Sequence, residues 1–262
     1  MEYRGRQFVF EESVRLGGGG MAEVYLGVRV DGPIEHVAFK MPSPDLHPDF
    51  RALFLREAEA AQRVSHPNIV KVIDWGADPD FIAFEYIEGT TLDKVISARQ
   101  GEQRLWTEAE LLGMFRQLVA AMEAINEHVV HRDLKPANVF LKEDGLLKVS
   151  DFGISKFVGE GARSRTFKGW GTLPYMAPES WTENRVDWAV DQYSLGIVFY
   201  ELATLQRPFV GSEDELRQQH LFQRPRRITD LVPGLSERLA TLVARMLEKQ
   251  VDRRFPNPWV CA

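Results

Sequence analysis

The chain of 262 residues contains only one cysteine, Cys261, so no disulfide can form within it. It also lacks any run of eighteen apolar residues, and the most apolar stretch, Tyr193–Leu205, is interrupted by Glu201. Because a helix needs about twenty apolar residues to cross a bilayer, we expect no membrane contact within this chain. The charged start, MEYRGRQFVFEE, predicts no secretory signal peptide. These absences favour a cytoplasmic location, with which a membrane tether beyond residue 262 is compatible.

A basic excess is also missing, since 32 Lys and Arg residues stand against 38 Asp and Glu residues, giving a net charge of −6. Nucleic-acid-binding domains usually carry a basic surface, so no nucleic-acid partner is expected. Apolar residues make up 44% of the chain and charged residues 27%, the proportions of an ordinary globular protein. With no internal repeat or low-complexity tract, the length suits one large domain or two fused lobes.

The hydrophobic pattern changes along the chain. Residues 8–40 alternate apolar and polar positions around a glycine cluster, which predicts strands. Residues 69–87 predict two more strands, joined by a turn at Ala77–Asp80. Between these segments, residues 50–64 have helical spacing and strong helix formers. EGTT at 88–91 ends this part, and mostly helical periodicity follows.

Three helices are expected in the second part. The segment from Thr107 to residue 128 opens with a capping box, because Glu110 stands three positions after the cap. Residues 187–204 are apolar almost throughout and predict a buried helix. The segment from Ser236 to residue 250 is amphipathic, with the serine as its cap. A strand-rich first third and a helix-rich remainder predict an α+β protein with two unlike lobes.

The most informative segment is HRDLKPAN at 131–138, followed by DFG at 151–153. Together they supply a candidate proton acceptor, Asp133, and two candidate metal-binding side chains, Asn138 and Asp151. Moving a phosphoryl group from ATP to a hydroxyl requires these functions. Negative charge spreads over phosphate oxygens in the transition state, so a protein must hold Mg²⁺ and orient the attacking oxygen.

These two segments resemble the catalytic loop and the metal-binding loop of eukaryotic-type (Hanks-type) protein kinases, and the resemblance covers nearly the whole chain. It implies a bilobal fold with a small antiparallel β-sheet lobe plus helix C and a larger, mainly helical lobe. We expect a single kinase domain over residues 1–262, with residues 1–87 as the N-lobe and hinge strand and residues 88–262 as the C-lobe.

The resemblance also implies roles in the chemical step. Asp133 is expected to be the catalytic base, or the group that orients the substrate hydroxyl. Lys135 is expected to neutralise charge on the transferred phosphate, and the Lys-Pro pair that it begins is typical of the serine/threonine branch. Asn138 and Asp151 are expected to bind Mg²⁺, with Mn²⁺ as an alternative. His131 is expected to pack against the phenylalanine of DFG.

LGGGGMAEVYLG at 16–27 resembles the glycine-rich loop that covers the nucleotide phosphates, in a form associated with bacterial members. Ala22 stands where the family usually has its third glycine. VAFK at 37–40 and FEYI at 84–87 resemble the third strand and the hinge. The nucleotide-binding residues that the resemblance implies are Leu16, Gly17, Gly19, Val24, Ala38, Lys40, Glu85 and Ile87.

Lys40 is expected to contact the α- and β-phosphates and to pair with a glutamate on the helix at 50–64. The candidates are Glu57 and Glu59, which face directions roughly 200° apart on a helix. The family places its glutamate nine residues before the His of HPNIV, here His66, and this register selects Glu57. Phe39 is expected to face away from Lys40, because neighbouring strand residues alternate.

The segment from Asp151 to Glu179 ends in GTLPYMAPE, which resembles the family's activation segment and its peptide-receiving end. Thr172 is expected to bond to the catalytic Asp and Lys. Glu179 is expected to pair with a buried arginine, Arg254 by register, with Arg253 as the alternative. Asp191 resembles the aspartate that anchors the catalytic loop backbone.

Regulation is expected in the same segment. Arg132 precedes the catalytic aspartate, and such an arginine often pairs with a phosphate. Ser164 and Thr166 lie in the basic run GARSRTFKG, so we expect autophosphorylation at one or both, with a homodimer as one arrangement for transfer in trans. The alternative is that both are ordinary polar loop residues.

Two other functions compete with an ATP-dependent kinase acting on serine and threonine of protein substrates. A catalytically weak pseudokinase or scaffolding module usually lacks a Lys, Asp or Asn of the set, yet Lys40, Asp133, Asn138 and Asp151 are all present. A small-molecule kinase of similar fold tends to lack the GT…APE segment, which this chain has.

Overall fold

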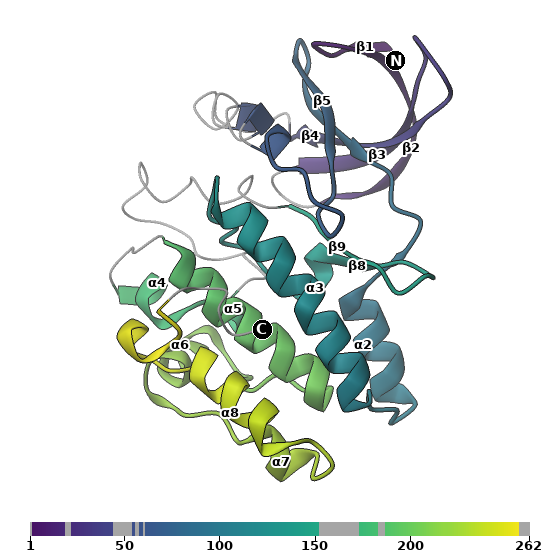
Figure 1. The fold of residues 1–262 in the computed structure, drawn as a ribbon. Coiled ribbons are helices and arrows are strands. Elements are labelled where there is room, and N and C mark those ends of the chain that lie inside the picture. Colours follow the sequence, from purple (N-terminus) through teal and green to yellow (C-terminus); the bar gives the residue numbers. More distant parts are fainter. Residues whose placement is uncertain are drawn as a thin grey trace.

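The computed structural model describes residues 2–18, 22–43, 54–55, 58–59, 61–151, 173–182 and 187–256. The first part of the chain forms a six-stranded antiparallel sheet in the order β1-β2-β3-β4-β6-β5 (Figure 1). Its strands are β1 (Glu2–Arg4), β2 (Val9–Gly18), β3 (Ala22–Arg29), β4 (His36–Pro42), β5 (Val72–Ala77) and β6 (Asp80–Glu85). The strands expected between residues 8 and 87 are thus confirmed, including the turn between β5 and β6.

Side chains on β4 alternate between two environments. Phe39 is fully buried and its ring lies 5.2 Å from that of Phe10 and 5.2 Å from that of Phe81. Lys40, one residue on, reaches the opposite side and contacts Asp151. The predicted opposition of Phe39 and Lys40 is confirmed. The outer cluster that receives Phe39 is separate from the main core and contains Tyr3, Phe10, Val37, Phe39, Phe81 and Ala83.

A buried carboxylate on β5 holds the turn between β1 and β2. Asp74 is fully buried and accepts hydrogen bonds from the backbone N–H groups of Arg6 (3.2 Å), Gln7 (2.8 Å) and Phe8 (2.9 Å). Successive N–H groups of this kind form an anion-binding concavity. Gly5 is required for the close approach, because a Cβ there would overlap the Asp74 carboxylate. The turn therefore links the β1 end of the sheet to β5.

The second part of the chain is mainly helical (Figure 1). Its α-helices are α2 (Leu92–Gly101), α3 (Glu108–Asn126), α4 (Pro178–Thr182), α5 (Trp188–Thr204), α6 (Glu213–Phe222), α7 (Ile228–Leu231) and α8 (Glu237–Met246). Short 3₁₀ turns are η1 (Pro136–Asn138), η3 (Leu173–Tyr175) and η4 (Val251–Arg253). A small sheet joins β7 (Thr90–Thr91), β8 (Val139–Leu141) and β9 (Leu147–Val149).

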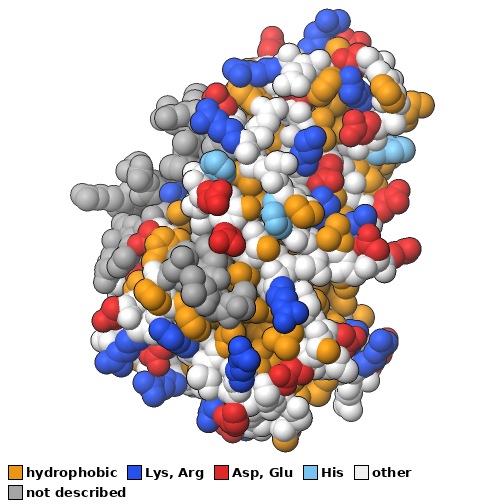
Figure 2. All heavy atoms as spheres, in the orientation of Figure 1, with side chains coloured by type: hydrophobic (Ala, Val, Ile, Leu, Met, Phe, Trp, Pro, Cys, Tyr) orange, Lys and Arg blue, Asp and Glu red, His pale blue; other side chains and the backbone are white. Residues whose placement is uncertain are grey.

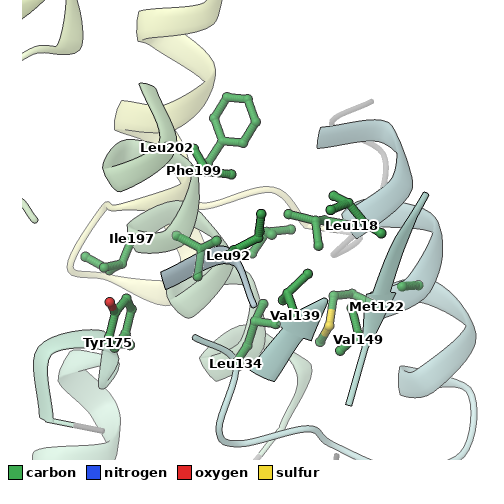
Figure 3. Close-up of a cluster of buried hydrophobic side chains, with 14 of the residues drawn as sticks. Leu92, Leu118, Met122, Leu134, Val139, Val149, Tyr175, Ile197, Phe199 and Leu202 are labelled. Carbon is green, nitrogen blue, oxygen red and sulfur yellow. The ribbon is translucent and has the colours of Figure 1, made fainter. Parts of the chain in front are cut away.

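The helices begin where the sequence predicts. Thr107 caps α3 in a reciprocal capping box with Glu110, and the Ser236 side chain accepts from the third backbone N–H of α8. α5 is buried along almost its whole length and packs with α3, β8 and β9 around the main core (Figure 3). In the segment expected to be helical at 50–64, the described residues 54–55, 58–59 and 61–62 are helical. Within the described residues, no helix combines the length and apolar character that a membrane span requires.

The two parts are joined through β9. The N–H of Val70 donates to the carbonyl of Val149 at 2.8 Å, and the N–H of Val149 donates to the carbonyl of Asn68 at 2.9 Å. The Asn68 amide also donates to the Leu147 carbonyl at 2.9 Å. These bonds place the end of β9, and the residues that follow it, directly beneath the six-stranded sheet.

Replacing Asp74 with alanine should lower the free energy of unfolding by about 3 kcal/mol, because several backbone N–H groups lose their acceptor. Chemical denaturation measures the change, with Glu143→Ala, an exposed carboxylate, as the matched control. A loss in Asp74→Ala no larger than that of the control would contradict the assigned role of this carboxylate.

Candidate active site

The loop from His131 to Asn138 is held from below by a carboxylate on α5. Asp191 is fully buried and accepts hydrogen bonds from the backbone N–H of His131 at 2.8 Å and of Arg132 at 2.8 Å. The Asn126 amide on α3 supplies a third at 2.8 Å. Arg132 has φ of +64°, a conformation that side-chain-bearing residues rarely adopt. The predicted anchoring by Asp191 is confirmed, and it explains how this strained backbone is maintained.

Three of the predicted site residues meet within this loop. The Lys135 ammonium donates to Oδ2 of Asp133 at 2.9 Å. The Asn138 amide donates to the same oxygen at 3.1 Å and to the Asp133 carbonyl at 2.9 Å. η1, which starts with Pro136, turns the chain so that Asn138 faces back toward Asp133. The Asp133 side chain is only 9% exposed, so these contacts define its orientation.

Asp151 connects the loop to the first part of the chain through a contact with Lys40. Its Oδ1 lies 2.5 Å from the ammonium of Lys40 on β4. The preceding residue, Ser150, donates its N–H to the Asn138 carbonyl at 2.8 Å, so the segment that carries Asp151 is tied to the loop. Asp151 itself has φ of +57°. Lys40 therefore joins Asp133, Asn138 and Asp151 at one location, although it lies more than ninety residues before them in the sequence.

The contact between Lys40 and Asp151 was not predicted from the sequence, which paired Lys40 with Glu57. Glu57 lies outside the described residues, so that pairing stays a prediction. The same holds for the other expected site residues that fall outside them, namely Gly19, Ser164, Thr166 and Thr172.

His131 lies behind the loop and is fully buried. Burial lowers the pKa of its imidazole, which favours the neutral ring. Its Nδ1 accepts from the Asp133 N–H at 3.2 Å, so the hydrogen is on Nε2, which lies 3.1 Å from the Ser150 carbonyl and donates to it. The imidazole thus links the two segments that carry Asp133 and Asp151. Its expected phenylalanine partner lies outside the described residues.

Strand register places three of the expected nucleotide-binding residues in one row. Gly17 on β2 is opposite Val24 on β3, and Val24 is opposite Lys40 on β4. Ala38 lies two residues before Lys40 on the same strand and is partly buried. Leu16 is 47% exposed at the edge of this row.

The end of β6 is tied to β9 by an ion pair that the sequence did not predict. The Glu85 carboxylate lies 2.6 Å from the Lys148 ammonium and accepts the Lys71 N–H at 2.8 Å. Its side chain is therefore engaged, and its backbone N–H donates to the Lys71 carbonyl at 2.9 Å. Ile87 follows just after β6 and packs partly buried against the main core.

The donor set suits a hard cation shared with a phosphate. Asn138 uses its amide hydrogens on Asp133, which leaves Oδ1 as an oxygen ligand, and Asp151 has Oδ2 in addition to the oxygen near Lys40. In the part of the chain that the structure describes, no group of three or more His, Cys, Asp or Glu forms a metal cage. Mg²⁺ is usually bound through one or two protein ligands together with substrate phosphates, so these residues fit it.

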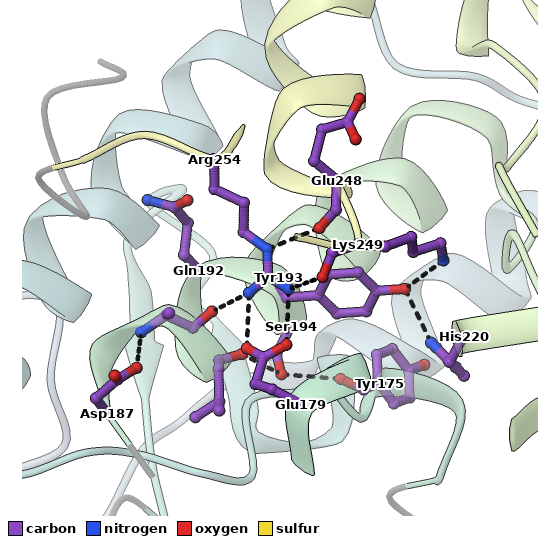
Figure 4. A network of polar contacts seen from close by, with 12 residues as sticks. Tyr175, Glu179, Asp187, Gln192, Tyr193, Ser194, His220, Glu248, Lys249 and Arg254 are labelled. Atoms are coloured by element: carbon purple, nitrogen blue, oxygen red, sulfur yellow. Dashed lines mark hydrogen bonds and ion pairs between the residues drawn. The ribbon is translucent and has the colours of Figure 1, made fainter. Parts of the chain in front are cut away.

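A buried ion pair supports the lower lobe (Figure 4). Arg254 donates from Nη1 and Nη2 to the two carboxylate oxygens of Glu179, each at 2.7 Å. It also donates to the carbonyls of Ala189 (2.9 Å) and Glu248 (2.8 Å). The predicted pairing of Glu179 with Arg254 is confirmed, and the alternative, Arg253, is wrong because that residue is exposed.

Comparison with known proteins identifies the family. A model described as "Protein kinase domain" matches residues 10–260, and the chain belongs to this family. Its fold is the bilobal protein-kinase fold that the sequence predicts. The crystal structure of the Mycobacterium tuberculosis PknI kinase domain superposes with a TM-score of 0.74 at 28% identity, covering 96% of this chain and 92% of that one.

Three curated relatives of this chain come from bacteria. The probable serine/threonine-protein kinase SCO3848 of Streptomyces coelicolor is 36% identical over 255 residues, which cover 92% of this chain and 37% of that protein. Serine/threonine-protein kinase PknJ of Mycobacterium tuberculosis is 34% identical, covering 92% of this chain and 42% of that protein. PrkC of Bacillus subtilis is 33% identical, covering 92% and 37%. The chain thus spans well under half the length of these relatives.

Replacing Arg254 with methionine should lower the free energy of unfolding by about 3–5 kcal/mol, because Glu179 is left as an unpaired buried charge. Removing both charges, in Glu179→Met with Arg254→Met, should cost less than the single change. Denaturant titration tests this, with Arg253→Met as the exposed neighbour that should alter stability by less than about 0.5 kcal/mol. If the loss of unfolding free energy in the double variant equals the sum of the losses in Glu179→Met and Arg254→Met, the pair is not coupled.

Proposed function

We propose that this chain transfers the γ-phosphate of ATP to serine and threonine hydroxyls of protein substrates. One observation carries the proposal: Lys40 and Asp151 are in contact next to a loop in which Lys135 and Asn138 both bind Asp133. Phosphoryl transfer depends on positioning and charge stabilisation, and this set supplies cations, metal ligands and a carboxylate for the acceptor. The relatives named as serine/threonine kinases support the choice of acceptor.

In the proposed reaction, the acceptor oxygen bonds to the γ-phosphorus while the bond from phosphorus to the ADP oxygen breaks. Asp133 accepts a hydrogen bond from the acceptor hydroxyl and takes its proton. Lys135, already 2.9 Å from that carboxylate, neutralises negative charge on the phosphoryl group as it moves. Thr172 is proposed to bond to both of these side chains and so to align the acceptor.

The nucleotide is proposed to lie between β2–β4 and the loop. Lys40 binds its α- and β-phosphates and is held by Glu57, while Asn138 and Asp151 hold Mg²⁺ in preference to Mn²⁺. Mg²⁺ neutralises charge on the phosphate oxygens when bound. The remaining proposed contacts are the phosphate-facing backbone of Gly17 and Gly19, the adenine-covering side chains of Leu16, Val24 and Ala38, and the backbone of Glu85 and Ile87.

We propose one kinase domain over residues 1–262, in which residues 1–87 form the N-lobe and hinge strand and residues 88–262 the C-lobe. A single cysteine in the whole chain supports a reducing, cytoplasmic location. On the face shown in Figure 2, acidic and basic side chains are interspersed, which supports protein substrates and not nucleic acid as partners. A homodimer would allow phosphorylation of one copy by the other.

Replacing Asp133 with asparagine should lower the rate of phosphate transfer by about 10²–10⁴-fold, because the carboxylate that receives the proton is lost. Transfer of labelled γ-phosphate to casein measures the rate, and calorimetry with ATP and Mg²⁺ checks that the variant still binds nucleotide. Asp252→Asn, on the exposed turn η4, is the matched control. A parental rate in Asp133→Asn would refute the proposed chemistry and favour a scaffolding module.

Autophosphorylation gives a second expectation, in which Arg132 pairs with a phosphate on Ser164 or Thr166. Incubation with ATP and Mg²⁺ should increase the intact mass of the parent chain. The double variant Ser164→Ala with Thr166→Ala should lose most of that increase, and Asp133→Asn should show none. An unchanged mass in the active parent would rule out this form of control.

A further inference from the structure

The ion pair between Lys148 on β9 and Glu85 at the end of β6 ties three segments of the chain together. The Lys148 ammonium lies 2.6 Å from Oε1 of Glu85 and donates to the Ile69 carbonyl at 3.3 Å. The same carboxylate oxygen accepts the Lys71 N–H at 2.8 Å. The lysine side chain is 12% exposed and the glutamate side chain 26% exposed. Residues 69–71, the end of β6 and β9 therefore meet at one largely buried pair.

The two members of this pair lead to opposite ends of the proposed nucleotide site. Glu85 begins the backbone stretch 85–87, which is proposed to receive the adenine. Lys148 lies three residues before Asp151, which is proposed to hold the metal beside the phosphates. Between them, Ser150 is bonded to the catalytic loop at 2.8 Å, so the chain from β9 to Asp151 has little freedom. A displacement of β9 is therefore passed on to the metal-binding carboxylate.

A second ion pair also joins the sheet to this segment, but it involves groups that the ligand needs. Lys40 contacts Asp151 at 2.5 Å, and both side chains are proposed to bind phosphate or metal. A bound nucleotide therefore competes for them. The side chains of Glu85 and Lys148 bond to protein groups and are not among the proposed ligand contacts, so the nucleotide does not compete for this pair.

A largely buried ion pair of this kind selects an arrangement more than it adds stability. Removing two charges from water costs about as much as their mutual attraction gains. The attraction is obtained in full only when the end of β6 and β9 are at the distance that brings the two side chains together. At another distance, each charge is left partly buried without its partner. The pair therefore favours one spacing of these two segments over others.

We propose that Glu85 and Lys148 are positioning residues for the nucleotide: their ion pair sets the distance between the backbone that receives the base and the carboxylate of Asp151. This inference rests on the proposed function, because it takes ATP with Mg²⁺ as the ligand. It predicts that loss of the pair weakens a ligand that reaches from the base to the metal. A ligand that occupies only the base end is unaffected, because it does not depend on the spacing.

Four variants separate the spacing from the stability of the fold. Lys148→Met removes the cation and keeps an unbranched side chain, whereas Lys148→Arg keeps a cation that can reach the same oxygen. Glu85→Gln combined with Lys148→Met removes both charges and leaves an amide oxygen for the Lys71 N–H, so no unpaired charge remains. Lys142→Met is the matched control, because it breaks an ion pair of 3.6 Å with Asp144 near the end of β8.

Equilibrium dialysis measures Kd for a non-hydrolysable ATP analogue with Mg²⁺ and, separately, for adenosine. Lys148→Met and the double variant should raise the Kd of the analogue about three- to tenfold, because only about a tenth to a third of the molecules then have the binding-competent spacing. The Kd of adenosine should stay within about twofold, since adenosine binds either spacing equally. Lys148→Arg and Lys142→Met should match the parent for both ligands.

Equal rises in Kd for the analogue and for adenosine in Lys148→Met, or parental values for both, would overturn the proposal. So would recovery of analogue binding in the double variant together with its thermal stability, because stability alone would then explain the loss. If the parent binds the analogue but transfers no phosphate, the proposed function fails, and the two Kd values still decide this inference. A parent that binds neither ligand would refute both.

Discussion

The buried carboxylate of Asp191 determines where the candidate active site lies. A charge in the protein interior is costly unless donors compensate it, and here the two backbone N–H groups of His131 and Arg132 and the Asn126 amide do so. Asp191 lies on α5, which is buried along almost its whole length. The loop is therefore attached directly to the main core. Without this acceptor, the backbone N–H of Arg132, a residue at positive φ, would lose its bond to Asp191.

The contact between the lobes depends on a second packing constraint, in the upper sheet. Phe39 is buried among the rings of the outer cluster, and strand alternation then directs Lys40 toward the lower lobe. On the other side, Ser150 binds the Asn138 carbonyl and so places Asp151. The ion pair of Lys40 with Asp151 is therefore the meeting point of two independently packed cores. A shift of either core changes the distance between the groups proposed to bind phosphate and metal.

Local sequence patterns predicted many of the strands, helices and site residues of this molecule. Contacts between residues far apart in the sequence were mostly not predicted. Asp133, Lys135 and Asn138 are within six residues, so their convergence follows from one turn and its motif. The pairing of Glu179 with Arg254 was reached through family register. By contrast, Asp74 with residues 6–8, and Glu85 with Lys148, join segments more than sixty residues apart. No periodicity or propensity specifies such pairs, because each partner looks like an ordinary surface residue in its own segment.

Two buried polar groups of the lower lobe, one around Arg254 and one around His220, differ in how completely their hydrogen bonds are satisfied. Arg254 makes a bidentate pair with Glu179 and binds neighbouring carbonyls, so movement there would break several charge-assisted bonds at once. Among the described residues, His220 retains a buried ring nitrogen, Nε2, without a hydrogen-bond partner. Tyr193 belongs to both groups, since Arg254 lies 5.0 Å from its ring centroid while its hydroxyl binds His220. The fully bonded ion pair and the partly bonded histidine therefore share one aromatic side chain, so a change at Tyr193 affects both groups.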